Sequence, residues 1–508
     1  MRRTDTALAA LGGAVAALVG ASAGHLVAAA TDPAASPVLA VGSTVIDLTP
    51  TPVKEWAVAR FGTADKPILV GSVLVVTLLL AALAGVVARR RPAAGLGVLA
   101  VLAVAAAGAA LTRPAAVALD AVPSLVTAVV GGLTLWLVSR RSSTRPAPGS
   151  PAAAEAPRSG PSRRSVLLLG TASAAALAGA GRWLTTLRSG PSSVMLPAAA
   201  DPAPALPEGL EARVPGISDL QTPAEDFYRI DTRLALPLVA ADDWRLTIDG
   251  DVDREVSLSY AELTAMPMVE RDITLNCVSN EVGGPYISSA RWLGVPLAAI
   301  LDRAGVGASA DQILSTDVDG FTISTPLEVA LDGRDTLVAV GMNGAPLPRA
   351  HGFPARLVTP GLYGFVGATK WLTRLTLTTY DDASAYWTDR GWATDAPVKI
   401  GSRIDTPRPL STVKPGDAVI GGVAWAQHRG IAGVEVRIDG GPWQQARLGP
   451  DVGVDYWRQW WLPWTAEEGR HALAVRARTV DGELQTSARV APFPDGSSGI
   501  QEVVVNVG

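Results

Sequence analysis

The chain has 508 residues, a formal net charge of −4 and a single cysteine. One cysteine excludes an intramolecular disulfide and every metal site built from several cysteines, including CxxC zinc sites, cysteine-ligated iron–sulfur clusters and CxxCH haem attachment. Residues 1–190 carry a net charge of +10 and the remainder carries −14, and an acidic soluble part without a basic stripe argues against nucleic acid as a partner.

The first part of the chain has the composition of a membrane protein. A hydrocarbon core about 30 Å thick requires roughly 20 apolar residues in a helix. Stretches of that length lie near residues 6–30, 67–88, 94–112, 117–138 and 165–184. Arginine clusters alternate with these stretches, and short cytoplasmic loops collect such charges. We therefore expect a multi-pass cell-membrane protein with a four-helix module (1–140), a cytoplasmic N-terminus and everything after about residue 188 outside.

Two patterns in this part suggest chemistry but have a simpler explanation. Residues 20–24 (GASAG) match the GxSxG nucleophile elbow, which needs a strand before it and a helix after it. Here the pattern lies inside an apolar helix, where small residues serve helix packing. His25 could ligate haem, but no other predicted span holds a second histidine. A transporter would need polar residues inside the spans, and these are nearly absent.

Two low-complexity segments flank the fifth apolar stretch (165–188). Residues 141–164 form a Pro/Ala-rich cytoplasmic linker, and residues 189–223 form an extracytoplasmic tether. Residues 162–170 (SRRSVLLLG) resemble a twin-arginine export signal, and they equally fit the positive flank of an ordinary fifth span. Both alternatives place the rest of the chain outside the cytoplasm.

Residues 224–400 are predicted to form an α+β domain that contains the cysteine. Residues 271–277 (RDITLNC) alternate like a strand, so Cys277 lies at a strand end, where a scaffold presents reactive groups. A lone cysteine at such a place is usually a small buried hydrophobic residue. Its flanking sequence decides between the two interpretations.

Residues 274–281 (TLNCVSNE) and 290–297 (ARWLGVPL) together resemble the metal-ligand loop of the sulfite-oxidase family of molybdopterin enzymes. The resemblance implies that the thiolate of Cys277 binds molybdenum, and a soft thiolate suits a sulfur-rich centre. It further implies catalytic positions for Cys277, Trp292 and Tyr363.

A longer run follows the family's cofactor segment in order: residues 341–348 (GMNGAPLP), 351–358 (HGFPARLV), 360–364 (PGLYG) and 370–372 (KWL). The resemblance implies that His351 and Arg356 hold the cofactor, with Lys370 and the backbone at Ala368 and Thr369 on its phosphate. Arginine is a bidentate donor to phosphate and lysine a point charge. Taken alone, Arg356 would be interpreted as one partner of a surface ion pair, and His351 as a turn residue.

A partial match covers residues 226–232 (DFYRIDT), the family's entry motif, and implies cofactor contacts for Tyr228, Arg229 and Asp231. Relatives that oxidise sulfite have Asn-His after the arginine, where this chain has Ile-Asp. Thr316 and Asp317 stand where the family makes another pterin contact. These assignments complete the predicted site for the molybdenum–molybdopterin cofactor.

The departures from the family pattern bear on the substrate. Sulfite oxidisers carry an arginine shortly after the ligand cysteine, and Val282 stands there instead, so a doubly charged oxyanion would be poorly held. We expect two-electron oxo transfer on a small extracytoplasmic molecule, with a protein or a quinone as redox partner. The alternatives are a periplasmic reductase of the methionine-sulfoxide type and a cofactor-free binding or sensor module on the same fold.

Residues 401–508 are predicted to form an immunoglobulin-like β-sandwich. Residues 434–438 and 472–476 alternate strictly, and each precedes an Asp-Gly turn. The segment also resembles the family's C-terminal dimerisation domain, which implies a homodimer through 401–508. Its tryptophans are interpreted as core and interface anchors.

Overall fold

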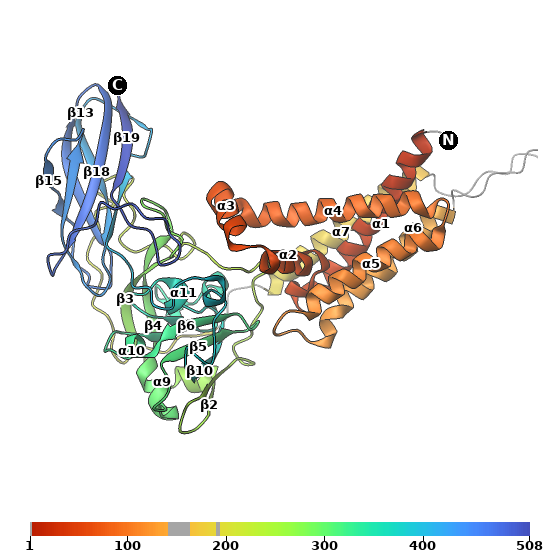
Figure 1. Cartoon of the computed structure of the whole chain (residues 1–508), viewed down its shortest axis with the longest axis horizontal. Helices are drawn as coiled ribbons and strands as arrows, with labels where there is room; N and C mark the ends of the chain where they lie inside the picture. Colours follow the sequence, from red (N-terminus) through yellow and green to blue (C-terminus); the bar gives the residue numbers. More distant parts are fainter. Residues whose placement is uncertain (1–2, 141–162, 189–193) are drawn as a thin grey trace, which may run out of the picture. The chain divides into compact units, whose positions relative to one another are not determined.

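The computed structural model describes residues 3–140, 163–188 and 194–508. The chain forms two compact units (Figure 1). The helical unit comprises Met1–Pro191 together with Asp231–Leu238, and the second unit comprises Ser192–Ile230 and Val239–Gly508. The predicted linker up to residue 162 and tether residues 189–193 lie outside the described residues, as does the start of the twin-arginine-like segment.

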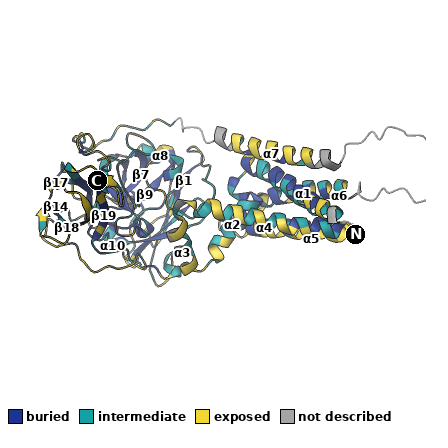
Figure 2. Cartoon of the chain, turned by 90° about the horizontal axis from the view of Figure 1, so that it is seen from above, coloured by how far each residue is buried: buried dark blue, intermediate teal, exposed yellow. Residues whose placement is uncertain are grey.

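Four helices of the helical unit are long and apolar enough to cross a membrane: Asp5–Ala30, Asp65–Ala88, Pro92–Leu111 and Ala118–Arg140. They correspond to α1 (Arg3–Ala30), α4 (Asp65–Ala88), α5 (Pro92–Leu111) and η3 (Ala118–Ala121) with α6 (Val122–Arg140). Large apolar side chains along them are exposed, among them Leu79, Val101 and Val104. Figure 2 shows exposed positions along α4 and α5. Such a surface suits lipid rather than water. The first four predicted spans are therefore helices of the expected length.

The fifth apolar stretch is also helical, as α7 (Arg163–Arg188), and it packs on α1. Val15 and Val19 of α1 are buried in one cluster with Ala174 of α7. Only part of the α7 side chains is described, so its crossing of the membrane remains a prediction.

Glycines bring the helices of this unit close together. A Cβ on Gly13 would lie 2.0 Å from the carbonyl oxygen of Ala81 in α4, and one on Gly20 would lie 2.6 Å from that of Thr127 in α6. Gly20 lies in the GASAG pattern, which runs inside the continuous α1 with no strand before it. The interpretation of this pattern as helix packing is confirmed.

The connection between α1 and α4 contains elements that the sequence did not reveal. These are η1 (Pro33–Ala35), α2 (Pro37–Leu48), α3 (Thr51–Phe61) and η2 (Gly62–Ala64). At the start of this connection, Arg113 donates to the carboxylates of Asp32 at 2.6 Å and Asp120 at 2.7 Å. With 12 residues in α2 and 11 in α3, these helices are shorter than the roughly 20 residues that a membrane span requires.

Two sheets form the front part of the second unit. One sheet has the order β2-β1-β10-β5-β6. Its strands are β1 (Arg245–Gly250), β2 (Val256–Ser259), β5 (Gln312–Asp317), β6 (Thr322–Pro326) and β10 (Leu372–Thr378), with β1 parallel to β10. The other has the order β3-β4-β7-β8, with β9 paired to β7. Its strands are β3 (Val269–Asn276), β4 (Ile287–Pro296), β7 (Leu337–Met342), β8 (Ala345–Pro346) and β9 (Arg356–Val358).

Both sheets contribute to one apolar core together with α8 (Tyr260–Thr264), α9 (Leu297–Ala304) and α10 (Leu327–Ala330), as expected of an α+β domain. Helix α11 (Gly364–Gly367) packs in a separate apolar cluster through Phe365 and Val366, and η4 (Arg349–His351) precedes β9. The strand expected before the cysteine is β3, which ends at Asn276, so Cys277 directly follows it. The prediction of Cys277 at a strand end is confirmed.

Two further sheets enclose the core of the C-terminal segment, whose centre includes Trp460, Val434 and Leu473. The first sheet has β11 (Gly401–Thr406), β13 (Gly416–Trp425), β17 (Arg458–Ala466) and β16 (Arg447–Leu448) in that order. The second has β12 (Thr412–Val413), β19 (Gln501–Val507), β18 (Gly469–Thr479), β14 (Ile431–Ile438) and β15 (Trp443–Gln445). A helical part followed by mostly-sheet domains confirms the coarse fold class.

Candidate functional site

Cys277 begins the loop between β3 and β4. Its amide donates to the carbonyl of Tyr286 at 3.0 Å, and its own carbonyl accepts the amide of Asn280 at 3.0 Å, which makes a tight turn. Its Sγ lies 2.9 Å from Oγ of Ser279. Burial raises the pKa of the Cys277 thiol, while the Ser279 hydroxyl and the positive charge of Lys370 act in the opposite direction. Groups that stabilise a thiolate therefore lie beside Cys277, although burial outweighs them.

Arg356, on β9, is a buried cation beside this loop. It is 5% exposed, its Nη1 donates to the carbonyl of His351 at 3.2 Å, and its Nε has no hydrogen-bond partner. Its guanidinium carbon lies 4.9 Å from the ring centre of Trp292. Desolvation lowers the pKa of Arg356 to about 10. A buried cation with an unpaired N–H is costly unless an anion completes it.

Trp292 and His351 form the wall around Arg356. Trp292 is fully buried on β4, and its Nε1 donates to the carbonyl of Ile273 at 3.1 Å. Nε2 of His351 lies 2.8 Å from the carbonyl of Ala224, so Nε2 carries the proton of the neutral ring. Burial, together with the charge of Arg356, lowers the pKa of His351 to about 4. His351 is therefore neutral at pH 7, with Nδ1 left as an acceptor.

Tyr228 and Tyr363 come to the same place from distant parts of the sequence. The amide of Tyr228 donates to Oγ of Ser288 at 3.2 Å, and its ring stacks on Phe227 with centroids 5.4 Å apart. Burial and the nearby Cys277 raise the pKa of both tyrosines well above the ordinary value. Both phenols therefore keep their protons at neutral pH and can act as hydrogen-bond donors.

The predicted phosphate segment lies next to these residues. Nζ of Lys370 donates to the carbonyl of Ile230 at 3.3 Å, and the positive charges of Arg356, Lys370 and Arg229 all lower the pKa of His351. Thr369 is buried, with its Oγ1 2.5 Å from Oγ of Ser315. The amide of Ala368 donates to the carbonyl of Gly364 at 3.1 Å, which closes α11. Three positive charges thus act on the imidazole of His351.

Thr316 and Asp317 end β5, and the side chain of Asp317 takes part in the turn that follows. Its carboxylate accepts the amides of Asp319 and Phe321, each at 2.9 Å. The carbonyl of Thr316 accepts the hydroxyl of Thr373 at 3.2 Å. These bonds do not involve a cofactor, so the pterin contact of Thr316 and Asp317 stays a prediction.

Asp231 is the one predicted site residue that belongs to the helical unit. Its Oδ1 accepts Nζ of Lys66, the second residue of α4, at 2.8 Å. The other predicted residues lie in the second unit. The sequence placed Asp231 with its neighbours Tyr228 and Arg229 because the motif is continuous, and a motif carries no information on a contact 165 positions away.

Sequence reasoning missed several residues that shape the site. Ser279 contacts the cysteine, Phe227 stacks between Tyr228 and Trp292, and Asn276 is buried with its Oδ1 unpartnered. Ser279 and Asn276 stand within the matched run around Cys277, so the motif contained them without indicating a role. Phe227 directly precedes Tyr228, and only its packing distinguishes it.

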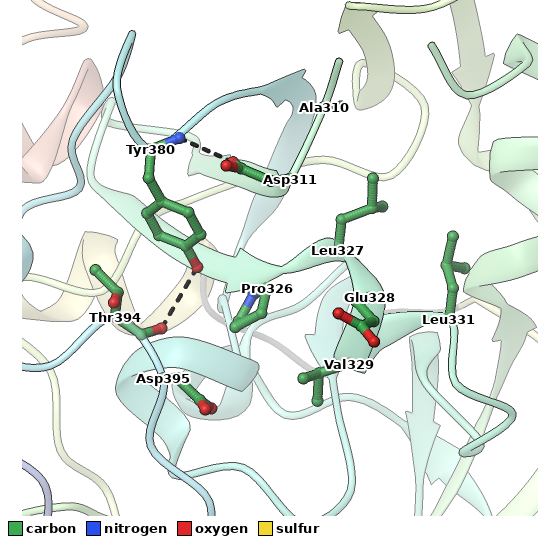
Figure 3. A pocket seen from close by; sticks show the side chains of 10 residues that line it. All are labelled: Ala310, Asp311, Pro326, Leu327, Glu328, Val329, Leu331, Tyr380, Thr394 and Asp395. Carbon is green, nitrogen blue, oxygen red and sulfur yellow. Dashed lines mark hydrogen bonds between the residues drawn. The ribbon is translucent and has the colours of Figure 1, made fainter. Parts of the chain in front are cut away.

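Two of the cavities in the second unit bear on the position of the site. One, of about 470 Å³, is lined by β6 and α10 residues, three carboxylates and Tyr380, whose hydroxyl donates to the carbonyl of Thr394 (Figure 3). It contains none of the predicted site residues. A narrower one lies beside the Cys277 loop, and its lining includes Asn276, Val282, Tyr363 and Lys399. The second cavity therefore adjoins the predicted site.

These residues fit a molybdenum–pterin cofactor. The unpartnered Nε of Arg356 calls for an anionic group, and Lys370 and Arg229 add positive charge for a phosphate. Within the described residues no three His, Cys, Asp or Glu side chains gather to hold a metal. A single cysteine at the metal is what a centre with further sulfur ligands from a cofactor requires.

The comparisons with known proteins agree with this chemistry. A family model described as "Oxidoreductase molybdopterin binding domain" matches residues 233–387. Sulfite oxidase of Gallus gallus is 31% identical over 321 residues, which cover 54% of this chain and 69% of that protein. Mitochondrial sulfite oxidase of Homo sapiens is 32% identical over 295 residues, which cover 49% of this chain and 54% of that protein.

A solved structure shares the fold. The sulfane dehydrogenase SoxCD of Paracoccus pantotrophus superposes with a TM-score of 0.50 at 24% identity, covering 57% of this chain and 83% of that chain. The chain spans just over half of the human relative and 69% of the chicken relative. Residue order, buried cations and relatives together identify an enzyme with a molybdenum cofactor, and the chain belongs to the sulfite-oxidase-type family of molybdopterin-dependent oxidoreductases.

Proposed function

We propose that this chain is a membrane-anchored enzyme that carries out two-electron oxo transfer on an extracytoplasmic substrate, with Cys277 as the protein ligand of molybdenum. The observation that carries the proposal is the buried Arg356, whose Nε has no partner among the described residues. The molybdenum cofactor, when bound, supplies oxygen-atom transfer coupled to two electrons.

The chain's own residues then have distinct roles. Cys277 ligates the metal through a thiol whose ionisation the Ser279 hydroxyl and the charge of Lys370 assist. Arg356, Lys370 and the backbone at Ala368 and Thr369 hold the anionic part of the cofactor. His351 stays neutral because its pKa is lowered to about 4, so it offers Nδ1 as an acceptor without adding charge.

Trp292 and Tyr363 are proposed to line the substrate side. Trp292 is fully buried and held by its bond to Ile273, so it gives a rigid apolar wall that excludes water. The raised pKa of Tyr363 keeps its hydroxyl protonated, so the hydroxyl can donate to an oxygen of the substrate. Tyr363 lines the narrow cavity beside the Cys277 loop.

The loop after Cys277 favours a neutral substrate over a doubly charged oxyanion. Val282 stands where sulfite oxidisers carry an arginine, and residues 278–286 contain neither arginine nor lysine. Lys399 lies near this loop, but it is paired with Asp495 at 2.9 Å. A sulfoxide of the methionine type is therefore the second candidate substrate. Its oxygen would leave as water, with two protons from solvent and two electrons from a redox partner that is a protein or a quinone.

Elemental analysis tests the cofactor assignment. Full-length protein made in a host that synthesises the cofactor is expected to hold about one molybdenum per chain, and Cys277→Ser to lose it. The exposed Lys414→Met serves as a control variant with unchanged content. A metal-free wild type would instead support the cofactor-free binding or sensor module.

Substrate assays distinguish oxidation of sulfite from reduction of a sulfoxide. Purified protein is tested against sulfite with an artificial acceptor and against methionine sulfoxide with an artificial donor. Turnover of the sulfoxide alone supports the reductase, and turnover of sulfite would contradict the argument from Val282.

Family resemblance further supports an immunoglobulin-type assignment and a homodimer contact for residues 401–508. Light scattering of the detergent-solubilised protein, corrected for detergent, tests the dimer.

A further inference from the structure

The loop that begins at Cys277, residues 277–286, is held from outside by the C-terminal segment 401–508. Within the loop, the carbonyl of Cys277 accepts the amide of Asn280 at 3.0 Å. The carbonyls of Asn280 and Gly284 accept hydrogen bonds from outside the loop, and both donors are side chains of the C-terminal segment. All of these residues belong to the second unit.

Ser497 holds the loop next to the cysteine. Its Oγ donates to the carbonyl of Asn280 at 2.6 Å. Asn280 is buried, its amide bonds to Cys277, and its Oδ1 accepts the amide of Tyr286 at 2.8 Å. One hydroxyl therefore fixes the residue that joins the start of the loop to its end.

Arg403, on β11, holds the loop at a second point. Its Nη1 donates to the carbonyl of Gly284 at 2.9 Å, and its Nη2 donates to Oγ of Ser218 at 2.8 Å. Its Nε donates to Oδ1 of Asp405 at 2.6 Å, and the two side chains are 12% and 8% exposed. The planar guanidinium thus makes three bonds in fixed directions, which a lysine ammonium group does not reproduce.

Close packing restrains the loop between these two bonds. Gly283 has a φ of +80°, and a Cβ there would lie 2.7 Å from Cδ of Gln501. Oε1 of Gln501 accepts the amide of Ile404 at 2.6 Å, which fixes its side chain. The loop therefore has no room to move toward the C-terminal segment at this point.

The strand before Cys277 is held by the same segment. β3 is the outermost strand of its sheet, so its outer edge takes partners from elsewhere. The amide of Thr274 donates to the carbonyl of Asp455 at 2.9 Å, and Oγ1 of Thr274 accepts the amide of Trp457 at 2.8 Å. Val278, directly after the cysteine, is buried in one apolar cluster with Trp457. The C-terminal segment thus restrains the chain on both sides of Cys277.

We infer that Arg403 and Ser497 are positioning residues for the metal-ligand loop, so that residues 401–508 support the molybdenum site in addition to the proposed dimer contact. The inference rests on the proposed role of Cys277 as the ligand of molybdenum. A ligand must stay at a fixed place relative to its metal, and the groups that orient it are as much part of the site as the ligand itself. Arg403 and Ser497 act through the backbone of Gly284 and Asn280.

The test uses full-length, molybdenum-loaded protein in detergent, in which Cys277 is the only cysteine that a maleimide can label. A thiolate bound to the metal is protected, so the labelling rate under native conditions measures how often the loop leaves the metal. Ser497→Ala and Arg403→Lys each remove one bond to the loop, and the lysine keeps a positive charge beside Asp405. Both variants are expected to be labelled about 5- to 10-fold faster, the factor that one lost hydrogen bond gives in a local opening equilibrium. Loss of molybdenum on dilution is expected to be faster by about 10-fold.

Three further variants serve as controls. Ser497→Thr keeps the hydroxyl group and is expected to be labelled at the wild-type rate. Arg476→Lys and Thr486→Ala change matched groups of the same segment, since Arg476 pairs with Glu435 at 2.7 Å and Oγ1 of Thr486 accepts the amide of Ala488 at 3.1 Å. Both are expected to keep wild-type labelling and molybdenum retention.

A merely structural role would lower the denaturant midpoint without raising the labelling rate above that of a control variant of equal stability. Wild-type labelling and retention in Arg403→Lys overturn the inference even if Ser497→Ala fails to fold. Labelling of Ser497→Thr as fast as that of Ser497→Ala also overturns it. A wild type without molybdenum overturns the proposed function itself, whereas a loaded wild type with normal variants overturns only the positioning role.

Discussion

Arg356 is the side chain that most directly indicates an anionic ligand at the site. It is buried against Trp292, its Nη1 has a carbonyl for a partner and its Nε has none. In a protein without its ligand such a group lowers stability, because no hydrogen bond offsets the free-energy cost of its desolvation. With an anion in place the same group becomes a strong, charge-assisted donor.

Arg356→Met should therefore have opposite effects on the two forms of the protein. In cofactor-free protein the variant is expected to be as stable as wild type or more stable, by up to about 1–3 kcal/mol, because an unsatisfied buried donor is removed. In loaded protein it is expected to lose most of its molybdenum. Denaturant midpoints and metal analysis measure the two effects, with the exposed Arg408→Met as control. A large loss of stability in the cofactor-free form would contradict this interpretation of Arg356.

Gly352 gives a second prediction at this scale. Its φ is +108°, and a Cβ there would lie 3.0 Å from Cα of Lys370 and 3.1 Å from the amide nitrogen of Trp371. Gly352→Ala is expected to destabilise the second unit by about 1–3 kcal/mol and to displace Lys370. Gly333 has a φ of +98° with no atom within 4 Å of an added Cβ, so Gly333→Ala isolates the backbone cost. Equal losses of stability and cofactor in both variants would show that the contact with Lys370 is unimportant.

At the scale of elements, the strands expected from short-range alternation are present in the structure. The alternation before Cys277 is β3, and the alternation before Asp439-Gly440 is β14. Asp439 and Gly440 both have positive φ, 50° and 70°, as a tight hairpin turn requires. The strand before Asp481-Gly482 is β18, which pairs with β14.

The β14–β18 pairing carries a pH-dependent contact. Nδ1 of His471 lies 2.6 Å from Oδ2 of Asp439, its Nε2 lies 2.8 Å from the carbonyl of Glu467, and both contacts raise the pKa of His471. A raised folded-state pKa stabilises the fold below the unfolded pKa, and this stability is lost as pH rises through the folded value. The denaturant midpoint of wild type should exceed that of His471→Gln more at about pH 5.5 than at about pH 9. Asp439→Asn should remove the difference, and an equal gap at both pH values would contradict the assignment.

At the scale of the whole molecule, the alternation of arginine clusters with apolar helices determines the proposed topology. Five crossings place residues after α7 opposite to the arginines at 89–91, whereas four crossings place them on the same side. Four helices meet the length and composition criterion for a membrane span. The side of the membrane on which the second unit lies therefore depends on whether α7 also crosses.

Cysteine labelling in intact cells measures this directly. Lys414→Cys is expected to react with an impermeant maleimide in intact cells, and Arg90→Cys only after lysis, each compared with the parent protein that retains Cys277. Reaction of both variants only after lysis would contradict the fifth crossing and place the catalytic domain in the cytoplasm.

The sequence by itself determined the features that depend on local order. Apolar length predicts helices of membrane-spanning size, alternation predicts β3, β14 and β18, and the ordered motifs around Cys277 and from His351 to Lys370 indicate the cofactor family. These follow because periodicity and motif order are properties of neighbouring residues.

Only the tertiary structure decided which side chains lack a partner and which distant ones meet. The burial of Arg356 depends on Trp292 and His351, and the contact of Asp231 with Lys66 joins residues 165 positions apart. No local pattern around Lys66 or Asp231 encodes the other residue as its partner. Such contacts between distant residues are therefore properties of the folded chain.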